Sequence, residues 1–275
     1  MIIIGLTGLH RAGKSYFRYS RVSESYGYNV VNKKELIVKL CRSYYLSKNI
    51  DLDETIKKEI ISKGLESNDK QFMNLFNNLI WKISNEWFGE QMYTNAQEVL
   101  YKLIKLANQL YGSKIVLDAI HNNLEWAVIS DFADKQGLIY FNTSRIIRER
   151  RPGELNNDVV SRKNIKRIGY WFNDKSLPSL ISSFSWCISG TEDILLNGQS
   201  FALLVRCIEN DISLNNVRLL LTKDCQYSIY DYKSEIIDDL CEEVMACNPY
   251  DENLHLRLIK EKNAINPCYG IKKQL

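Results

Sequence analysis

Eight residues near the start of the sequence have the types and spacing of a phosphate-binding loop, G-x-x-x-x-G-K-S, from Gly8 to Ser15. The two glycines let the backbone wrap around an anion and present its N–H groups to it. We expect Lys14 to reach the β- and γ-phosphates of a nucleoside triphosphate and the Ser15 hydroxyl to bind Mg²⁺. The sequence therefore predicts ATP and Mg²⁺ as cofactors, with the nucleotide bound by Gly8, His10, Arg11, Ala12, Gly13, Lys14, Ser15 and Tyr16.

The segments on both sides of this loop are of the kinds that the motif requires. Residues 2–7 form a continuous apolar run, which predicts a buried, parallel-type strand. Residues 13–26 have a helical pattern that ends at Gly27. The positive end of that helix would face the bound phosphates. A loop of this kind can also bind a nucleotide without transferring a phosphoryl group, and that alternative stays open.

A second acidic position follows the clearest later strand, which the pattern predicts over residues 114–120. Asp118 lies near the carboxyl end of that strand, where open α/β sheets place their ligands. We expect it to orient the acceptor or the water shell of the magnesium ion. The alternative is a structural one, in which Asp118 caps the loop at residues 121–123.

Positive charge gathers after the strand predicted at residues 138–141. Four arginines lie within seven residues there, at Arg145, Arg148, Arg150 and Arg151, followed by the pair Pro152-Gly153. Arginines on a mobile lid neutralise the charge of a transferring phosphoryl group and exclude water. Lys14 and Asp118 are the first two predicted catalytic residues, and the resemblance described below implies a lid at about 145–173 with Arg148 and Arg151 as the other two. A solvated basic helix face is the alternative interpretation.

Alternating strand and helix patterns position these residues. Strands are predicted at 2–7, 28–31, 114–120, 138–141 and 186–189, and helices at 13–26, 34–48, 51–64, 66–84, 91–111, 124–136, 144–151 and 200–209. This alternation predicts a three-layer α/β fold with a mostly parallel, five-stranded sheet. Residues 1–210 would form this domain, with a helical acceptor insert at about 34–111. Residues 211–275 would be a C-terminal extension of unknown role, with strands at 217–222 and 226–230, a helix at 234–247 and an irregular end.

The composition is that of an ordinary globular protein. The chain has 275 residues, of which 45% are hydrophobic, and a formal net charge of +3. The seven cysteines are scattered without a CxxC pair, which favours reduced thiols and a cytoplasmic location. No apolar stretch is long enough for a membrane span, and the balanced charge disfavours nucleic acid as a partner. Homodimerisation stays open, and the small-molecule nucleotide acceptor expected as a partner is what the resemblance described next implies.

Two stretches, the strand–loop–helix at 2–26 and the segment at 115–125, resemble a known group of proteins. They are similar to the nucleoside monophosphate kinases and dephospho-coenzyme A kinases among the P-loop proteins. The likeness is strongest to deoxynucleoside monophosphate kinases, viral ones included, and to the kinase-like domain fused to some deoxycytidylate deaminases. Those proteins carry an Asp-Gly-Ile-Arg-Asn-like segment and then a Glu, which Asp118, Asn122 and Glu125 match here, while Ala119 replaces the glycine and His121 the arginine.

The resemblance covers roughly residues 1–210 and implies an enzyme. It would move the γ-phosphoryl group of ATP to a small phosphorylated acceptor, above all a (deoxy)nucleoside monophosphate. The expected acceptor contacts are Asn32, Lys33, His121 and Asn122. Because His121 stands where the family has an arginine, either the acceptor differs or another basic residue binds its phosphate. Asn32 fits equally well as a helix cap paired with Glu35. The alternatives are a nucleotide-binding regulatory or sensor module without transfer activity, and a kinase of a coenzyme A precursor.

Overall fold

The computed structural model describes residues 1–153, 155–189, 194–212 and 229–265. The chain divides into two compact units. The first, here called the sheet unit, consists of Met1–Val30 and Ser113–Leu275. The second, here called the helical unit, consists of Val31–Gly112. Each unit is described by itself.

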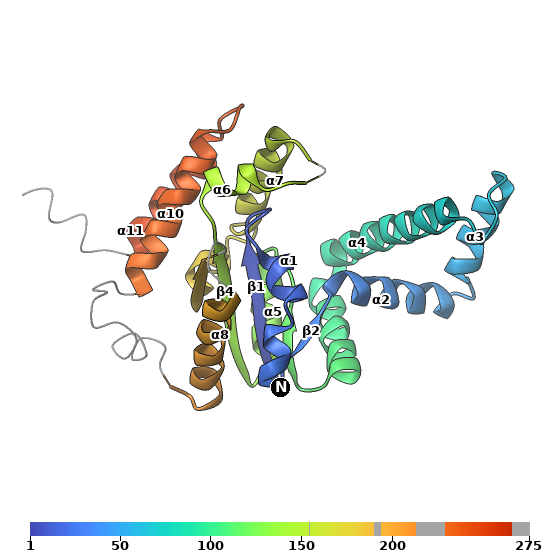
Figure 1. Cartoon of the computed structure of the whole chain (residues 1–275), viewed down its shortest axis with the longest axis horizontal. Helices are drawn as coiled ribbons and strands as arrows, with labels where there is room; N and C mark the ends of the chain where they lie inside the picture. The colour runs from blue at the N-terminus through green and yellow to red at the C-terminus, as the bar shows by residue number, and fades with distance from the viewer. Residues whose placement is uncertain (154, 190–193, 213–228, 266–275) are drawn as a thin grey trace, which may run out of the picture. The chain divides into compact units, whose positions relative to one another are not determined.

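Five strands form the sheet, in the order β2-β3-β1-β4-β5 (Figure 1). Their bounds are β1 (Ile2–Gly8), β2 (Asn29–Val31), β3 (Lys114–Leu117), β4 (Lys135–Asn142) and β5 (Trp186–Ser189). The β1–β3, β1–β4 and β4–β5 pairs are parallel. The chain leaves β1 toward β2 on one side and leaves β4 toward β5 on the other. Connections therefore diverge at the carboxyl ends of the neighbouring strands β1 and β4, which is where open α/β sheets hold their ligands.

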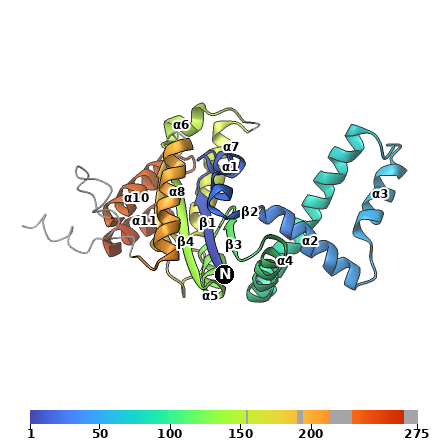
Figure 2. The ribbon, with the colours of Figure 1, turned by 60° about the horizontal axis from the view of Figure 1, so that its bottom comes forward.

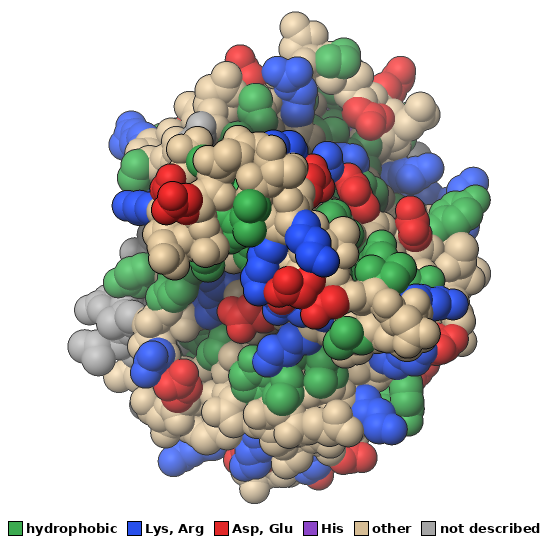
Figure 3. Space-filling model, turned by 90° about the vertical axis from the view of Figure 1, so that its right-hand side faces the viewer, with side chains coloured by type: hydrophobic (Ala, Val, Ile, Leu, Met, Phe, Trp, Pro, Cys, Tyr) green, Lys and Arg blue, Asp and Glu red, His purple; other side chains and the backbone are tan. Residues whose placement is uncertain are grey.

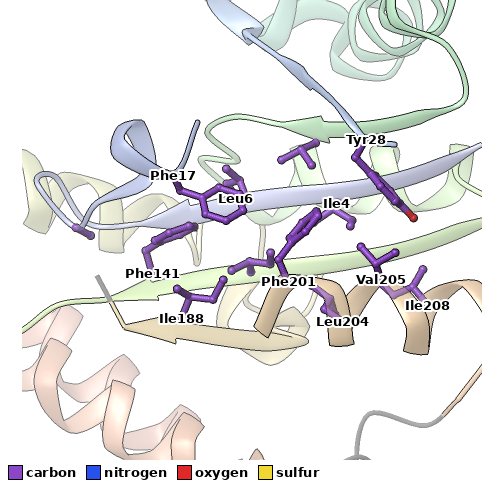
Figure 4. Packing of buried hydrophobic residues seen from close by; sticks show 13 residues of the cluster. Ile4, Leu6, Phe17, Tyr28, Phe141, Ile188, Phe201, Leu204, Val205 and Ile208 are labelled. Atoms are coloured by element: carbon purple, nitrogen blue, oxygen red, sulfur yellow. The ribbon is translucent and has the colours of Figure 1, made fainter. Parts of the chain in front are cut away.

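Helices cover both faces of the sheet (Figures 1 and 2). On one face, α1 (Lys14–Tyr19) and α8 (Ile194–Glu209) bury an apolar cluster that Figure 4 shows in close-up. At its centre the ring of Phe17 lies 5.5 Å, between centroids, from those of both Phe141 and Phe201. On the other face, α5 (Asn123–Phe132) packs against β1. The predicted three-layer α/β fold with a five-stranded sheet is confirmed.

A glycine in β1 sets how closely α5 approaches the sheet. A Cβ atom at Gly5 would lie 2.7 Å from the Trp126 ring and 2.9 Å from the Ile120 side chain. Such distances are shorter than packed side chains allow, so the position accepts only hydrogen. The close approach fixes the start of α5 next to the carboxyl end of β1.

The helix predicted at 13–26 is instead two shorter segments. Helix α1 ends at Tyr19, and a 3₁₀ helix, η1 (Val22–Tyr26), follows after Arg21, whose φ is 55°. The Ser20 hydroxyl donates to the Phe17 carbonyl at 2.6 Å, a local bond that competes with helix continuation. Gly27 ends the segment as predicted, with φ of 77°.

The segment after β4 is more helical than its polar sequence indicated. It contains α6 (Arg145–Arg150) and α7 (Asn157–Tyr170), and the Asn156 side chain caps α7 by accepting the Val159 N–H at 2.9 Å. A short 3₁₀ helix, η2 (Leu180–Ser183), precedes β5.

The C-terminal segment contributes two paired helices, α10 (Ile229–Met245) and α11 (Glu252–Ile265). The first overlaps the helix predicted at 234–247. The prediction of an irregular end was wrong up to residue 265, because Leu254 and Leu258 bury one face of a regular helix. The predicted strand at 217–222 and most of that at 226–230 lie outside the described residues, and the last two positions of the latter belong to α10.

The helical unit is built from α2 (Lys33–Ser47), α3 (Leu52–Ser62) and α4 (Lys70–Tyr111). We predicted two helices in place of α4, separated at 85–90. The interruption lies instead at Asn95, the one residue within α4 whose φ and ψ are not helical (−152° and 59°). No helix among the described residues combines the length and apolar character that crossing a membrane requires. Figure 3 shows one face of the molecule, on which basic and acidic side chains are interspersed.

Candidate functional site

The predicted phosphate-binding loop connects β1 directly to α1. Its backbone takes left-handed conformations at Arg11 (φ 62°) and Gly13 (φ 104°). At Gly8 the φ is 137°, and a Cβ there would lie 2.9 Å from the Phe141 carbonyl oxygen of the neighbouring strand. The glycines that the motif requires are thus explained by backbone conformation and by the close approach of β4.

Two cationic side chains meet on the carbonyl groups of this loop. The Lys14 ammonium donates to the Gly8 and Leu9 carbonyls at 2.8 and 2.7 Å. The Arg167 guanidinium, from α7, donates to the same Gly8 carbonyl at 2.9 Å. Burial, and then the charge of Arg167, lower the pKa of Lys14 well below its usual value, against the opposing effect of Asp118. Burial also lowers the pKa of Arg167. A bound polyphosphate would offset this concentration of positive charge.

His10 contributes no charge to the loop at neutral pH. Its pKa is lowered to about 3, first by burial and then by the charges of Arg167, Lys14 and Lys163. Its backbone N–H donates to the Asn164 side-chain oxygen at 2.8 Å. The residue therefore fixes the loop backbone to α7 while its imidazole stays neutral.

The outside of the loop is held by residues that follow β4. The Thr143 hydroxyl donates to the Ala12 carbonyl at 2.9 Å, and the Arg151 guanidinium donates to the Arg11 carbonyl at 2.6 Å. The Arg11 guanidinium donates in turn to the Asn157 side chain at 2.9 Å and to the Leu155 carbonyl. Arg151, predicted as a catalytic lid residue, thus contacts the loop backbone, and its contact with a transferring phosphoryl group stays a prediction.

Arg148 lies in the interior, behind the loop. Its side chain is 5% exposed and donates to the Glu243 carboxylate at 2.8 Å and to the Thr143 carbonyl at 2.9 Å. Glu243, on α10, is 1% exposed and also accepts from the Asn164 amide at 2.9 Å. The observed contacts of Arg148 are therefore structural, and its predicted part in catalysis has no contact of its own to support it.

Asp118 lies beside the loop in an ion pair. The Arg18 guanidinium, one turn after Lys14 on α1, donates to its carboxylate at 2.6 Å, and Asp118 is 8% exposed. Strand β3 ends at Leu117 rather than at residue 120, because Ala119 turns the backbone with φ of 67°. The Ile120 N–H then bonds the Leu6 carbonyl at 2.8 Å, which holds this segment against β1.

Two of the predicted acceptor residues, Asn122 and Asn32, are the N-cap residues of α5 and α2. The Asn122 side chain accepts the Glu125 N–H at 2.7 Å, and the Glu125 carboxylate accepts the His121 N–H at 2.8 Å. In the helical unit the Asn32 side chain accepts the Lys34 N–H at 3.1 Å, which confirms the capping interpretation. The acceptor roles of His121, Asn122, Asn32 and Lys33 stay predictions.

Two side chains at or beside the loop, Ser15 and Asp118, carry oxygens of the kind that could hold a magnesium ion. Ser15 is exposed in the first turn of α1, as is Tyr16 next to it, and Asp118 supplies a carboxylate beside the loop. The described residues contain no cluster of three or more His, Cys, Asp or Glu suited to a metal. Mg²⁺ needs none, because it is commonly held by one or two protein oxygens together with phosphate oxygens and water.

Sequence reasoning missed three side chains at this site. Arg18 could have been found, because a residue four positions after Lys14 lies on the same face of a helix. Arg167 was visible only as one member of a long basic stretch. Asn164 carries no sequence signal, because its role depends on a contact across 154 residues.

Comparisons with known proteins give distant similarities in structure. No family model and no curated protein matches the sequence. Among solved structures, TT1252 from Thermus thermophilus is 14% identical with a TM-score of 0.38, covering 75% of this chain and 96% of its own. A sugar kinase from Janibacter sp. HTCC2649 is 10% identical with a TM-score of 0.38, covering 77% and 97%. Dephospho-CoA kinase from Campylobacter jejuni is 14% identical with a TM-score of 0.36, covering 75% and 96%. Similarity at this level assigns neither a family nor a substrate to the chain.

Proposed function

We propose that the chain binds ATP–Mg²⁺ at the loop Gly8–Ser15 and transfers the γ-phosphoryl group to a small phosphorylated acceptor. A (deoxy)nucleoside monophosphate is the acceptor class that we put first. The observation that carries the proposal is the convergence of Lys14 and Arg167 on the Gly8 carbonyl, within a complete strand–loop–helix motif. Two cations on one short loop are suited to the several negative charges of a triphosphate.

The reaction asks little covalent chemistry of the protein. An oxygen of the acceptor phosphate attacks the γ-phosphorus, the bond to the β,γ-bridging oxygen breaks, and ADP leaves. The attacking oxygen is already ionised at neutral pH, so no general base is required. The protein has to align the two substrates and neutralise the charge of the transition state.

Each residue of the site has a part in that task. Lys14 and the N–H groups at the start of α1 would hold the β- and γ-phosphates, and Arg167 would move from the Gly8 carbonyl to a phosphate oxygen. Ser15 and Asp118 would hold Mg²⁺ directly or through water, and the ion would supply additional charge neutralisation. Arg18, beside Asp118, would take the part that the family arginine plays where this chain has His121.

A second function is favoured by one contact. The Asp118 carboxylate is engaged by Arg18 at 2.6 Å and largely buried, as expected of a structural ion pair. If that pair persists when nucleotide binds, Asp118 is not available to a metal or an acceptor. The chain would then be a nucleotide-binding regulatory module that retains the loop and lacks transfer activity.

The test separates binding from transfer. Nucleotide affinity is measured with a fluorescent ATP analogue. ADP release is measured with ribo- and deoxyribonucleoside monophosphates as acceptors. Dephospho-coenzyme A is added to the panel to test the coenzyme A precursor as an alternative acceptor. We expect Lys14→Ala to lower kcat/KM by on the order of 100-fold or more. The exposed Lys63, which follows the last residue of α3, provides a matched control, and Lys63→Ala should change neither quantity.

The outcomes distinguish the two functions. Acceptor-dependent ADP release that is lost in Lys14→Ala and in Asp118→Asn supports the transferase. Nucleotide binding that depends on Lys14, without turnover of any acceptor in the panel, supports the regulatory module. Absence of nucleotide binding by the wild-type chain refutes both.

A further inference from the structure

The phosphate-binding loop is supported from behind by a residue far away in the sequence, Glu243 on α10. Its carboxylate is 1% exposed and has a different partner on each oxygen. One oxygen accepts from the Asn164 amide at 2.9 Å, and the other accepts from the Arg148 guanidinium at 2.8 Å. A carboxylate so deeply buried persists only when its charge and its hydrogen bonds are satisfied, as they are here.

Each of these partners leads to the loop by a separate path. On the first path, the Asn164 side-chain oxygen accepts the backbone N–H of His10 at 2.8 Å. On the second path, the Arg148 Nε donates to the Thr143 carbonyl at 2.9 Å, and the Thr143 hydroxyl donates to the Ala12 carbonyl at 2.9 Å. The two paths reach the loop on either side of Arg11.

The residue between the two attachment points has an unfavourable backbone conformation. Arg11 has φ of 62°, a left-handed conformation that costs a residue with a side chain free energy and persists only where its surroundings impose it. The attachments at His10 and Ala12 fix the backbone on both sides of it. A loop held in this way presents its N–H groups to a phosphate without first having to be ordered.

We propose that Glu243 is a positioning residue of the phosphate-binding loop, acting through Asn164 and Arg148 to keep the segment His10–Ala12 in its binding conformation. The inference rests on the proposed nucleotide binding and assigns a part in it to the C-terminal helix α10. Glu243 touches neither the loop nor the nucleotide that the loop would bind. Its contribution is therefore to affinity, through the order of the loop.

The experiment compares three single variants of the full chain and one double variant. Glu243→Ala breaks both paths, whereas Asn164→Ala breaks only the first and leaves the Arg148–Glu243 ion pair in place. Leu240→Ala is the control, because it removes a fully buried side chain from the same helix and destabilises the fold without touching either path. For each variant we measure the unfolding temperature, the Kd for ATP–Mg²⁺, and hydrogen exchange of the loop peptide containing residues 8–15.

We expect Glu243→Ala and Asn164→Ala to weaken ATP–Mg²⁺ binding by about tenfold and to speed exchange of the loop amides. Leu240→Ala should lower the unfolding temperature and change neither measurement. In the double variant, Asn164→Ala should add little to Glu243→Ala, because the first path is already broken.

The inference is overturned if affinity and loop exchange follow the unfolding temperature equally in all three variants, or if both affected variants bind as tightly as the wild type. If Glu243→Ala does not fold, the test rests on Asn164→Ala, because that variant keeps the buried Arg148–Glu243 ion pair. Failure of the proposed function is a separate result. A wild-type chain that binds no nucleotide would refute that function, while the exchange of the loop amides would still test the positioning role.

Discussion

Helices α6 and α7 follow one another in the sequence and are both basic, yet their arginines have different surroundings. In α6, Arg148 points into the interior and pairs with Glu243. In α7, Arg167 donates to the Gly8 carbonyl of the phosphate-binding loop. The sequence pattern favoured the first of these helices as the source of catalytic arginines, and the geometry favours the second.

The difference arises because a buried acid far away in the sequence, Glu243, engages Arg148 in the interior. An arginine with a carboxylate partner in the interior has its charge satisfied and stays in place. Arg167 instead donates to a backbone carbonyl, and the charges of the Asp118 and Glu125 carboxylates favour its charged form. Two features of the sequence, the position of an arginine after a strand and the density of positive charge around it, do not distinguish Arg148 from Arg167.

The largest effect that would test this comparison is on stability. We expect Arg148→Ala to lower the free energy of unfolding by about 3–5 kcal/mol, because it leaves the Glu243 carboxylate buried without its cation. Urea denaturation followed by circular dichroism measures the change. Arg145→Ala, on the same helix, breaks a half-exposed pair with Glu149 and should cost less than about 1 kcal/mol. Equal losses in the two variants would contradict the distinction.

The second effect is on nucleotide binding, which this variant should change far more than it changes the free energy of unfolding. We expect Arg167→Ala to weaken ATP–Mg²⁺ binding by about ten- to a hundredfold, the range for losing a hydrogen bond to a charged group. Its effect on the free energy of unfolding should be below about 1 kcal/mol. Titration calorimetry and denaturation on the same preparation measure both quantities. Lys166→Ala provides the control one residue away, and a loss of affinity as large in that variant would break the comparison.

The smallest effect is a pH dependence that reports first the burial of His10 and then the charges placed beside it, those of Arg167 and Lys163 on α7 included. The pKa of His10 is about 3 in the folded chain and near 6.5 ordinarily, so the unfolded chain binds a proton between these values that the folded chain does not. The contribution of neutral His10 to the free energy of unfolding is therefore present above pH 6.5 and is lost as the pH falls toward 3. We expect His10→Gln to remove about 1 kcal/mol of this dependence, allowing for screening by solvent. Unfolding midpoints of the wild type and of His10→Gln between pH 7.5 and 4.5 measure this difference. An equal pH dependence of the midpoint in the two chains would contradict the prediction.

Local patterns predicted the sheet and its phosphate-binding loop well. The apolar run at 2–7 and the glycines of the loop carry their conformational requirements within a few residues, and the short strand at 186–189 was predicted at its observed bounds. Interruptions of helices were predicted less well. The break at Arg21 depends on side-chain bonding at Ser20 and on packing of η1 against α8, and the position of the kink at Asn95 has no local signal that we can identify.

The supports of the loop could not be predicted, because they depend on long-range contacts. Arg148 and Arg167 both lie in basic stretches of the sequence, and their contacts with Glu243 and with the Gly8 carbonyl distinguish them. Glu243 is one of two adjacent acidic residues on that helix, and burial distinguishes it from its neighbour Glu242. An inference from spacing alone had no means of choosing between them.

The supports of the loop also set an order of events while the chain is being made. The loop leaves the ribosome before its supports, because Asn164 follows His10 by 154 residues and Glu243 follows Asn164 by a further 79. At roughly 5–20 residues per second, translation of that interval lasts on the order of tens of seconds. Until that interval ends, the loop lacks Glu243, the last of these residues to be made. A nascent chain would therefore hold the segment His10–Ala12 in its binding conformation only once α10 has emerged and docked.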